Sequence, residues 1–540
     1  MTEPKTFIRT PALQFNLISP PVDFTGRKAE LATLLANFER GVLITSATDD
    51  LGNGMTALAR QLAAELSKDF PDGCLEIDLR GGMSNLIEPL TSAAAQRRLL
   101  MLFYPDTALP DDEKALDELY RETFTTRKVL LLLDNAASPA QLRHLLPRQS
   151  SAVIVTARIE FPTLGKLYPF SLGGLRPEEA RALLMHVAPG CAAMPPRSIN
   201  KILEHFDGSP LALRLVGALL RDVTPRALLN RYKVINRRLI ALRPAGINLP
   251  VTIALELVYE TLPLEQRSFF EALAIFPAPF SRGAAAMIWG LDVDAADALL
   301  VAFVRRNLVM YYPEVDRYAL HDLVSVYAQE LLLGQPEWTR LVMARYARYA
   351  LMEASRANVL YHAGGVRREE GVLRFAAVWP HVWSAWLRMS NADPGWPRPT
   401  DVDQWLCDFP GRVFPIAHLM LPMAERTAIL ERVLEAARSL DRAAEGLILN
   451  YLGQAYAAQG ESERALEVYD ACLKIAYDLH DRPGEANALL NIGIVCGALG
   501  NIKRVRESWR HALALFKMIG DPRAAQVRAW LETLESKLAQ

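Results

Sequence analysis

The chain has 540 residues, of which 51% are hydrophobic and 22% are charged, a composition typical of a globular protein. This length predicts roughly three or four domains. Its 60 Lys and Arg residues balance 61 Asp and Glu residues, so the net charge of -1 gives no reason to expect nucleic-acid binding. The N-terminus lacks a signal-type apolar core, and no apolar run reaches the ~18 residues of a membrane span. We therefore expect a cytoplasmic protein without membrane contact, whose five scattered cysteines are reduced and buried.

Residues 1–22 are expected to form a short N-terminal leader, and residues 23–175 alternate apolar runs with helical patterns. The five strand candidates are Gly41–Ser46, Cys74–Leu79, Val129–Leu133, Ala152–Thr156 and Leu167–Leu172. The run Val129–Leu133 is apolar on both faces, which suits a central strand buried between helices. The alternation predicts a parallel sheet in an α/β sandwich of the P-loop NTPase type, within a multidomain chain of α/β and α domains.

The next two regions differ from this alternation. Residues 176–247 have helical patterns throughout and are expected to form a helical domain. In residues 248–335, helices are followed by a predicted hairpin of Asn307–Tyr312 and Asp316–Leu320 and then by a further helix, His321–Leu332. This order of elements predicts a winged-helix domain.

The C-terminal region, residues 441–540, contains a repeat and follows a helical linker region at residues 336–440. The recurring positions pair Leu452-Gly453 with Ile492-Gly493, and Tyr469 with Trp509. Small and aromatic residues at these offsets are what tetratricopeptide helix pairs use to nest. The period exceeds the usual ~34 residues, which fits a long-helix variant. We therefore expect a C-terminal α-solenoid of tetratricopeptide (TPR) type.

The segment Thr48–Thr56 stands where a phosphate-binding loop should stand, between a strand candidate and an amphipathic helix. Such a loop aims backbone N–H groups and a helix N-terminus at phosphate oxygens. In the pattern GxxxxGK[ST], Gly54 and Thr56 fit, but Met55 replaces the lysine and Asp49 replaces the first glycine. The segment is therefore predicted to be a degenerate Walker A loop.

Five further motifs follow one another in order along the chain. They are Phe24–Arg27, Lys128–Asn135, Thr156–Arg158, Gly208–Leu213 and Tyr318–Asp322. Together they resemble the motifs of the NB-ARC branch of the STAND signalling ATPases, most closely the bacterial type with C-terminal tetratricopeptide repeats. The resemblance covers about residues 23–333 and the repeats. It implies a switch in which ADP holds the domains in a closed monomer and exchange for ATP opens the chain for assembly.

The resemblance also implies roles for individual side chains around the nucleotide. Phe24 and Arg27 match the motif that lies over the adenine, and Pro210 matches the proline that packs against the base. Arg158 matches the arginine that senses the terminal phosphate. His321 matches the histidine that holds the ADP phosphates and locks the closed state.

The phosphate loop and its magnesium ion are implied by a second set of residues. Gly52, Gly54, Met55 and Thr56 occupy the loop, and Asp134 occupies the magnesium-facing position of Walker B. If nucleotide binds, Thr56 and Asp134 are the expected magnesium ligands. ADP or ATP with Mg²⁺ is thus the expected cofactor, although the loop weakens this expectation.

Three departures from the family pattern argue against hydrolysis. A thioether at Met55 cannot supply the positive charge of a lysine, and Asp49 places a negative charge beside the phosphates. Asn135 stands where many relatives have the acidic residue that activates water, and an amide cannot take a proton. We therefore do not expect an ATPase, while weak or absent nucleotide binding and nucleotide binding with little hydrolysis both stay open.

The same residues also have structural interpretations that need no ligand. Arg158 could be a surface cation, Asp134 could cap a turn at the end of its strand, and His321 could be the N-cap of a helix. Met55 could simply pack against the sheet. These alternatives stay open beside the functional ones.

Three functions are weighed. The first is a signalling or regulatory scaffold with a degenerate ADP/ATP site, whose repeats bind an effector or sensor protein in trans, because 22 leading residues cannot encode an effector domain. The second is an active ATP/ADP switch that forms homo-oligomers. The third is a nucleotide-independent TPR adaptor. The winged helix and the balanced charge do not favour a sequence-specific transcription factor, so no nucleic-acid partner is expected.

Overall fold

The computed structural model describes residues 17–21, 24–39, 41–46, 52–81, 88–104, 107, 109–147, 150–164, 167–242, 249–390 and 395–539. Residues 47–51, which include Asp49 of the predicted Walker A loop, lie outside the described residues. The chain divides into two compact units, which are described separately. The first comprises Met1–Ala350, Ala376–Ser384 and Gly395–Pro397, and the second comprises Leu351–Phe375, Ala385–Pro394 and Arg398–Gln540.

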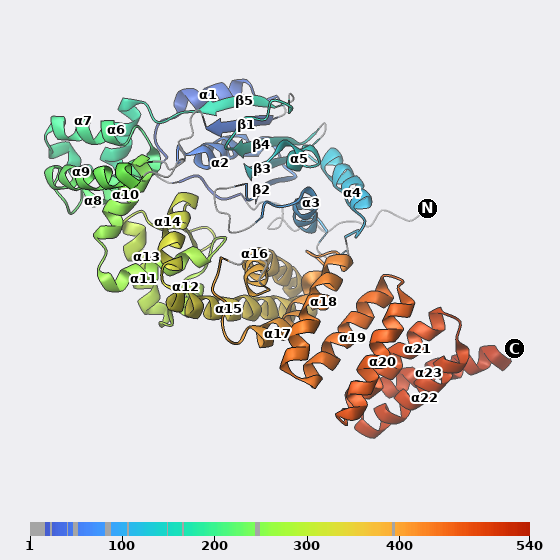
Figure 1. Ribbon diagram of the computed structural model, residues 1–540. Helices are drawn as coiled ribbons and strands as arrows, with labels where there is room; N and C mark the ends of the chain where they lie inside the picture. Colours follow the sequence, from blue (N-terminus) through green and yellow to red (C-terminus); the bar gives the residue numbers. More distant parts are fainter. Residues whose placement is uncertain are drawn as a thin grey trace. The chain divides into compact units, whose positions relative to one another are not determined.

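The first unit is built on a five-stranded parallel sheet with strand order β2-β3-β4-β1-β5 (Figure 1). The strands are β1 (Gly41–Ser46), β2 (Gly73–Asp78), β3 (Val129–Ala136), β4 (Ala152–Ala157) and β5 (Tyr168–Leu172). All five lie where the sequence predicts them, with ends that differ by at most three residues. Leu131 pairs with Leu75 on one side and Val153 on the other, so β3 is an interior strand, as its apolar sequence requires.

Helices pack around this sheet, and the main apolar cluster lies between it and α2. The helices are α1 (Lys28–Ala36), α2 (Met55–Leu66), η2 (Ser67–Asp69), α3 (Ser92–Met101), α4 (Glu113–Thr126) and α5 (Pro139–Arg143). Leu58 and Leu62, one turn apart on α2, are completely buried against Val42 and Ile44 of β1. The spacing of apolar residues along α2 therefore fixes which face of this helix lies on the sheet.

The helical region follows β5, as the sequence predicts. Its elements are α6 (Pro177–Val187), η3 (Pro189–Ala193), α7 (Pro196–His205), α8 (Pro210–Leu219) and α9 (Pro225–Leu242). Pro210 is the first residue of α8, where its missing N–H has no intrahelical partner to lose, and the Ser209 hydroxyl accepts the N–H of Ala212. Ser209 and Pro210 of the GSPLAL motif (Gly208–Leu213) therefore begin α8.

The following region has the order of elements expected of a winged helix. Its elements are α10 (Leu249–Glu260), α11 (Leu264–Ala272), η4 (Leu273–Ile275), α12 (Arg282–Trp289), α13 (Val293–Arg305), β6 (Met310–Tyr312), β7 (Arg317–Ala319) and α14 (Asp322–Leu333). The strands β6 and β7 form an antiparallel hairpin that is shorter than the predicted strands. Asn307 and Asp316 have left-handed φ values of 55° and 48°, and this backbone geometry ends the extended structure.

Two long helices, α15 (Pro336–Ala363) and α16 (Val366–Met389), contribute residues to both units. The second unit continues with helices alone. They are α17 (Val402–Ala417), α18 (Met423–Leu440), α19 (Arg442–Ala458), α20 (Ser462–Asp478), α21 (Arg482–Ala498), α22 (Ile502–Ile519) and α23 (Arg523–Ala539) (Figure 1). Successive helices from α17 onward pack against one another, as in a solenoid.

Glycines allow the repeat helices to approach closely. A Cβ atom at Gly453 would lie 2.5 Å from the Tyr469 ring, and one at Gly493 would lie 2.2 Å from Nε1 of Trp509. These are the glycine and aromatic positions that recur in the sequence. The repeat predicted from them is confirmed as two helix pairs followed by α23.

Two further observations concern the cysteines and the apolar helices. All five cysteines are free and buried. Within the described ranges, none of the helices is long and apolar enough to cross a membrane.

Candidate nucleotide site

Two glycines shape the described part of the Walker A segment. Gly52 and Gly54 have left-handed φ values of 86° and 87°, which residues with a Cβ atom rarely adopt. Gly54 is the N-cap of α2, and among the described residues no side-chain hydrogen bond caps this helix. The first turn of α2 therefore keeps the N–H groups and the positive dipole end that favour an anion.

Met55 occupies the lysine position as the first residue of α2. Its side chain is partly buried and packs against the apolar cluster between α2 and the sheet. This placement agrees with the interpretation of Met55 as a packing residue. A cation at this position is absent, so the loop lacks the charge that a P-loop directs at the β- and γ-phosphates.

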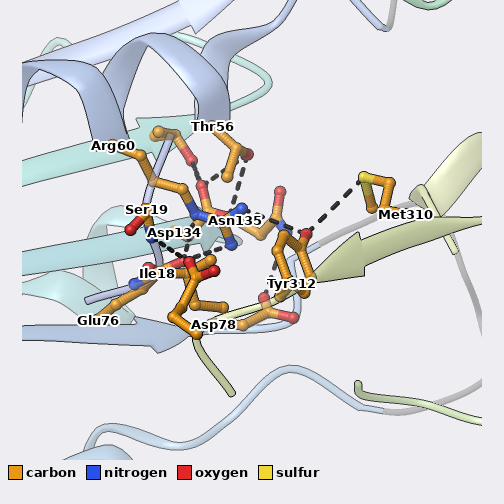
Figure 2. A network of polar contacts seen from close by, with 12 residues as sticks. Ile18, Ser19, Thr56, Arg60, Glu76, Asp78, Asp134, Asn135, Met310 and Tyr312 are labelled. Carbon is orange, nitrogen blue, oxygen red and sulfur yellow. Dashed lines mark hydrogen bonds and ion pairs between the residues drawn. The ribbon is translucent and has the colours of Figure 1, made fainter. Parts of the chain in front are cut away.

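Thr56 and Asp134 lie in direct contact (Figure 2). The Thr56 hydroxyl lies 3.0 and 3.1 Å from the two carboxylate oxygens of Asp134, and the Thr156 hydroxyl donates to Oδ1 at 2.5 Å. Burial raises the pKa of Asp134 to about 7, and the carboxylates of Asp78 and Glu76 act in the same direction. The structure thus brings together the two predicted magnesium ligands.

Asn135 follows Asp134 with a left-handed φ of 54°. Its N–H donates to the Thr156 hydroxyl at 2.9 Å, and its side-chain amide donates to Oδ1 of Asp78 at 3.3 Å. The amide is therefore bound to the end of the neighbouring strand β2. Neither its chemistry nor this contact suits a base that activates water.

The two residues predicted to lie over the adenine have different surroundings. Phe24 packs at the margin of the apolar cluster. Arg27 is only 4% exposed, and its guanidinium donates to the carbonyls of Asn53 (3.2 Å), Gly173 (2.6 Å) and Gly174 (3.2 Å). It also pairs with Glu30 at 3.0 Å. Arg27 therefore ties the Walker A segment to the loop after β5, a role that the motif comparison did not predict.

Three motifs that are far apart in the sequence meet at Gly52. A Cβ atom at this position would lie 3.3 Å from Cβ of Leu211, in the GSPLAL motif, and 3.4 Å from Cδ1 of Leu323, at the start of α14. Pro210 lies beside Gly54, with its Cγ 3.8 Å from the position of a Cβ there. The predicted loop, helical and winged-helix motifs therefore share one location.

Arg158 and Asp322 form an electrostatic pair near this location. Burial lowers the pKa of Arg158, and Asp322 opposes the shift. Burial also raises the pKa of Asp322 to about 6, with Asp78 adding to the effect and Arg158 opposing it. Within the described part of the chain, the Arg158 guanidinium makes no hydrogen bond, so its donors are not committed to a protein acceptor.

His321 is the N-cap of α14, as one of its structural interpretations proposes. Its Nδ1 accepts the N–H of Leu323 at 3.2 Å, and burial together with the charge of Arg214 lowers the pKa of His321 to about 4. The ring is therefore neutral at neutral pH, and its proton lies on Nε2. An N-cap role and a donor role toward a phosphate use different ring nitrogens, so they are compatible.

Sequence reasoning missed Arg60, which lies one turn after Thr56 on α2. Its Nε and Nη2 donate to Oε1 of Glu76 at 2.9 and 2.7 Å, and its Nη1 donates to the Tyr312 hydroxyl at 3.3 Å. Arg60 also lowers the pKa of Asp134 electrostatically. A charged residue in an amphipathic helix is no distinctive sequence signal, and the partners of Arg60 come from two distant elements.

Comparisons with known proteins agree with this architecture. A family model described as tetratricopeptide repeat matches residues 444–518. Regulatory protein AfsR of Streptomyces griseus is 35% identical over 320 residues, which are 57% of this chain and 32% of that protein. AfsR of Streptomyces coelicolor is 33% identical over 322 residues, with the same 57% and 32% coverage. The chain thus spans about a third of the length of these curated relatives.

Two more distant proteins are also similar to this chain. Apoptotic protease-activating factor 1 of Danio rerio is 24% identical over 296 residues, covering 50% of this chain and 23% of that protein. A crystal structure of a STAND protein with a tetratricopeptide repeat sensor from Pyrococcus horikoshii covers 97% of this chain and 88% of its own, with a TM-score of 0.45 and 17% identity. The chain is therefore similar over more than half of its length to the AfsR regulatory proteins, and residues 444–518 form tetratricopeptide repeats.

Proposed function

We propose that this protein is a regulatory scaffold with a degenerate ADP/ATP site, and that its repeats bind an effector or sensor protein in trans. The proposal draws on the relatives named AfsR, which are regulatory proteins. It also draws on the general use of stacked helical repeats as protein-binding surfaces. Each part of the proposal has its own support and its own test.

The observation that carries the proposal is the meeting of three motifs at Gly52. Leu211 belongs to the helical region, and Leu323 belongs to the region that follows it. A ligand held by the loop would therefore touch elements from both regions as well as the α/β domain. Such a site couples its occupancy to how these regions pack, which is what a switch requires.

The described residues fit a nucleoside diphosphate with Mg²⁺ in part. The N-terminus of α2 suits a phosphate, Thr56 and Asp134 suit the metal, and Arg158 and Nε2 of His321 offer further donors. Hydrolysis is not expected, because Met55 brings no charge and Asn135 is not a base. Bound nucleotide would then act as a structural ligand of the closed arrangement.

The first test is whether the purified full chain carries nucleotide. The protein is denatured, and the supernatant is separated by ion exchange beside known amounts of ADP and ATP. ADP at close to one equivalent supports a ligand-locked scaffold. An empty chain that also fails to bind added ADP or ATP with Mg²⁺ in calorimetry overturns the nucleotide part of the proposal.

The second test addresses the partner. The full chain is tagged and recovered from its native host, beside the same chain carrying Gly493→Ala, which places a Cβ against Trp509 in the repeats. A protein that co-purifies with the unaltered chain and is lost with the variant supports binding through the repeats. Recovery of the chain alone contradicts it.

An ATP-driven switch that oligomerises is the second candidate, favoured by the retention of Gly52, Gly54, Thr56 and Asp134 in a P-loop arrangement. Gel filtration with and without ATP and Mg²⁺ tests it directly. An increase in particle size with ATP favours this candidate. An unchanged particle size favours the regulatory scaffold over the switch. If the chain also binds no nucleotide, an unchanged size favours a TPR adaptor.

A further inference from the structure

Residues 17–21 run between two glutamates that belong to different elements. The N–H of Ile18 donates to Oε2 of Glu76 at 3.0 Å, and the N–H of Ser19 donates to Oε1 of Glu314 at 3.0 Å. Glu76 lies on β2, the edge strand of the sheet, whereas Glu314 lies in the turn between β6 and β7. Two successive N–H groups therefore connect the α/β domain to the hairpin.

Arg60 makes a second connection between the same two elements (Figure 2). Its guanidinium donates twice to Oε1 of Glu76, the carboxylate that also accepts from Ile18. It donates to the Tyr312 hydroxyl as well and lies 5.4 Å from the centroid of that ring. Glu76 is thus the common acceptor for the segment and for the helix α2.

The contacts around Glu76 are largely shielded from water, whereas the bond from Ser19 to Glu314 is exposed. The side chains of Arg60 and Glu76 are 12% and 8% exposed, and their nitrogen and oxygen lie 2.7 Å apart. Leu17 packs against the apolar cluster of the α/β domain, which anchors the start of the segment. A buried ion pair that loses one of its hydrogen-bond partners is destabilised far more than an exposed one.

Glu314 responds to the same contacts. Burial by itself would raise the pKa of Glu314, but its own N–H, the N–H and hydroxyl of Ser19 and the charge of Arg60 outweigh burial and hold this pKa below its usual value. The ionised carboxylate is therefore the form that the segment binds.

The hairpin in turn positions part of the nucleotide site. β7 ends at Ala319, and His321 and Leu323 follow within four residues. Leu323 lies against Gly52, and the N–H of Leu323 donates to His321. A shift of the hairpin away from the sheet would move both residues away from the Walker A segment.

We propose that residues 17–19, Arg60, Glu76, Tyr312 and Glu314 form an intramolecular clasp that holds the hairpin, and with it His321 and Leu323, against the phosphate loop. Withdrawal of the segment breaks two charge-assisted hydrogen bonds and loosens the hairpin, which Arg60 still contacts through Tyr312. The clasp would thus regulate nucleotide binding, and this part of the inference rests on the proposed function. The hold of the clasp on the hairpin does not depend on that function.

Proline substitutions test the clasp because they remove a backbone donor and leave the glutamates in place. Ser19 precedes Pro20 and is therefore already restricted to extended backbone, so proline is tolerated there. Ile18→Pro removes the donor to Glu76, and Ser19→Pro removes the donor to Glu314. Ser19→Ala is the matched control, because it keeps the N–H and loses only the hydroxyl.

Hydrogen exchange followed by mass spectrometry is measured on the full chain without added nucleotide. Exchange over residues 308–325 should become about tenfold faster in Ile18→Pro and Ser19→Pro, and change less in Ser19→Ala. Exchange over β3 should stay at the unaltered rate, which shows that the sheet remains folded. Tyr312→Phe, which keeps the ring and loses the hydroxyl, should give a smaller increase over the same residues.

Hairpin exchange at the unaltered rate in both proline variants overturns the clasp. This outcome is distinct from a failure of the proposed function, because the exchange is measured in the absence of nucleotide and partner. A chain that binds no ADP can still show the clasp. A chain that binds ADP can still lack it.

Discussion

The Thr56 hydroxyl lies within hydrogen-bond distance of both carboxylate oxygens of Asp134, at 3.0 and 3.1 Å. A hydroxyl and a carboxylate that would share a magnesium ion are therefore bonded to each other. This bond, together with that from Thr156, satisfies a carboxyl group that is only 5% exposed. The same burial raises the pKa of Asp134 to about 7.

Replacing Asp134 with Asn should remove a pH-dependent loss of stability. The pKa of this carboxyl is about 7 in the folded chain and ~3.9 when unfolded, so its stabilising effect is complete below pH ~4 and is lost as pH rises through 7. Between pH 5 and pH 8, urea unfolding should show the unaltered chain losing roughly 2 kcal/mol more than Asp134→Asn. Identical pH dependence of the two chains would contradict the raised pKa.

Two substitutions at His321 separate its cap from its titration. His321→Ala removes the acceptor for the Leu323 N–H and should cost about 1 kcal/mol at pH 7, whereas His321→Asn keeps an N-cap and should cost less. The lowered pKa of His321, about 4, adds stability above pH ~6.5 that is lost as pH falls through 4. His321→Asn should therefore lose less stability than the unaltered chain between pH 7 and pH 4 in thermal melts.

Met55→Lys restores the lysine of the Walker A pattern. We expect the affinity for ADP with Mg²⁺ to rise about tenfold or more, because an ammonium at the start of α2 meets the phosphates directly. Met55→Leu is the control, since it keeps the packing against the apolar cluster and adds no charge. Calorimetric titration with ADP and Mg²⁺ measures the affinity of both variants. Equal affinities would show that the missing lysine charge does not limit nucleotide binding.

Gly52→Ala should destabilise the closed arrangement by roughly 1–3 kcal/mol. The position has a φ of 86°, and the new methyl group would lie 3.3 Å from Leu211 and 3.4 Å from Leu323. Gly173→Ala is the matched control, because nothing lies within 4 Å of a Cβ there. Denaturant midpoints should separate the two variants clearly. A Gly52→Ala chain as stable as the control would show that the loop is not packed between these leucines.

Alanine substitutions at two glycines of α21 should change the stability of the repeats in opposite directions. Gly493→Ala drives a methyl group into Trp509 and should cost about 1–3 kcal/mol. Gly497→Ala meets only Val505 at an ordinary distance of 3.9 Å and should stabilise the helix by roughly 0.5–1 kcal/mol. Circular dichroism during urea unfolding measures both. The same sign for both variants would rule out the close nesting of α21 on α22.

The elements were predictable where local pattern and burial agree. All five strands and the repeat glycines Gly453 and Gly493 could be predicted, because the pattern that identifies each of them lies within a short stretch of sequence. The predicted hairpin is longer than the observed one, because it included Asn307 and Asp316, whose backbone is left-handed.

The candidate site could be predicted less completely. Thr56 and Asp134 meet as expected, because parallel strands end at one edge of a sheet. The contacts of Arg27 with the carbonyls of Gly173 and Gly174 could not be predicted, because they join residues 146 and 147 positions apart. Arg60 was missed because its acceptor on β2 and its tyrosine on β6 are brought together only by the fold.

Arg27 has one more consequence, which concerns how the first unit moves. Its N–H donates to Oε1 of Glu179 on α6 at 2.9 Å, while its guanidinium holds the loop before α6 and the carbonyl of Asn53. The predicted Walker A segment, the loop after β5 and α6 are thereby fastened through one residue. We therefore expect a motion that separates Gly52 from Leu323 to leave the contacts of Arg27 intact.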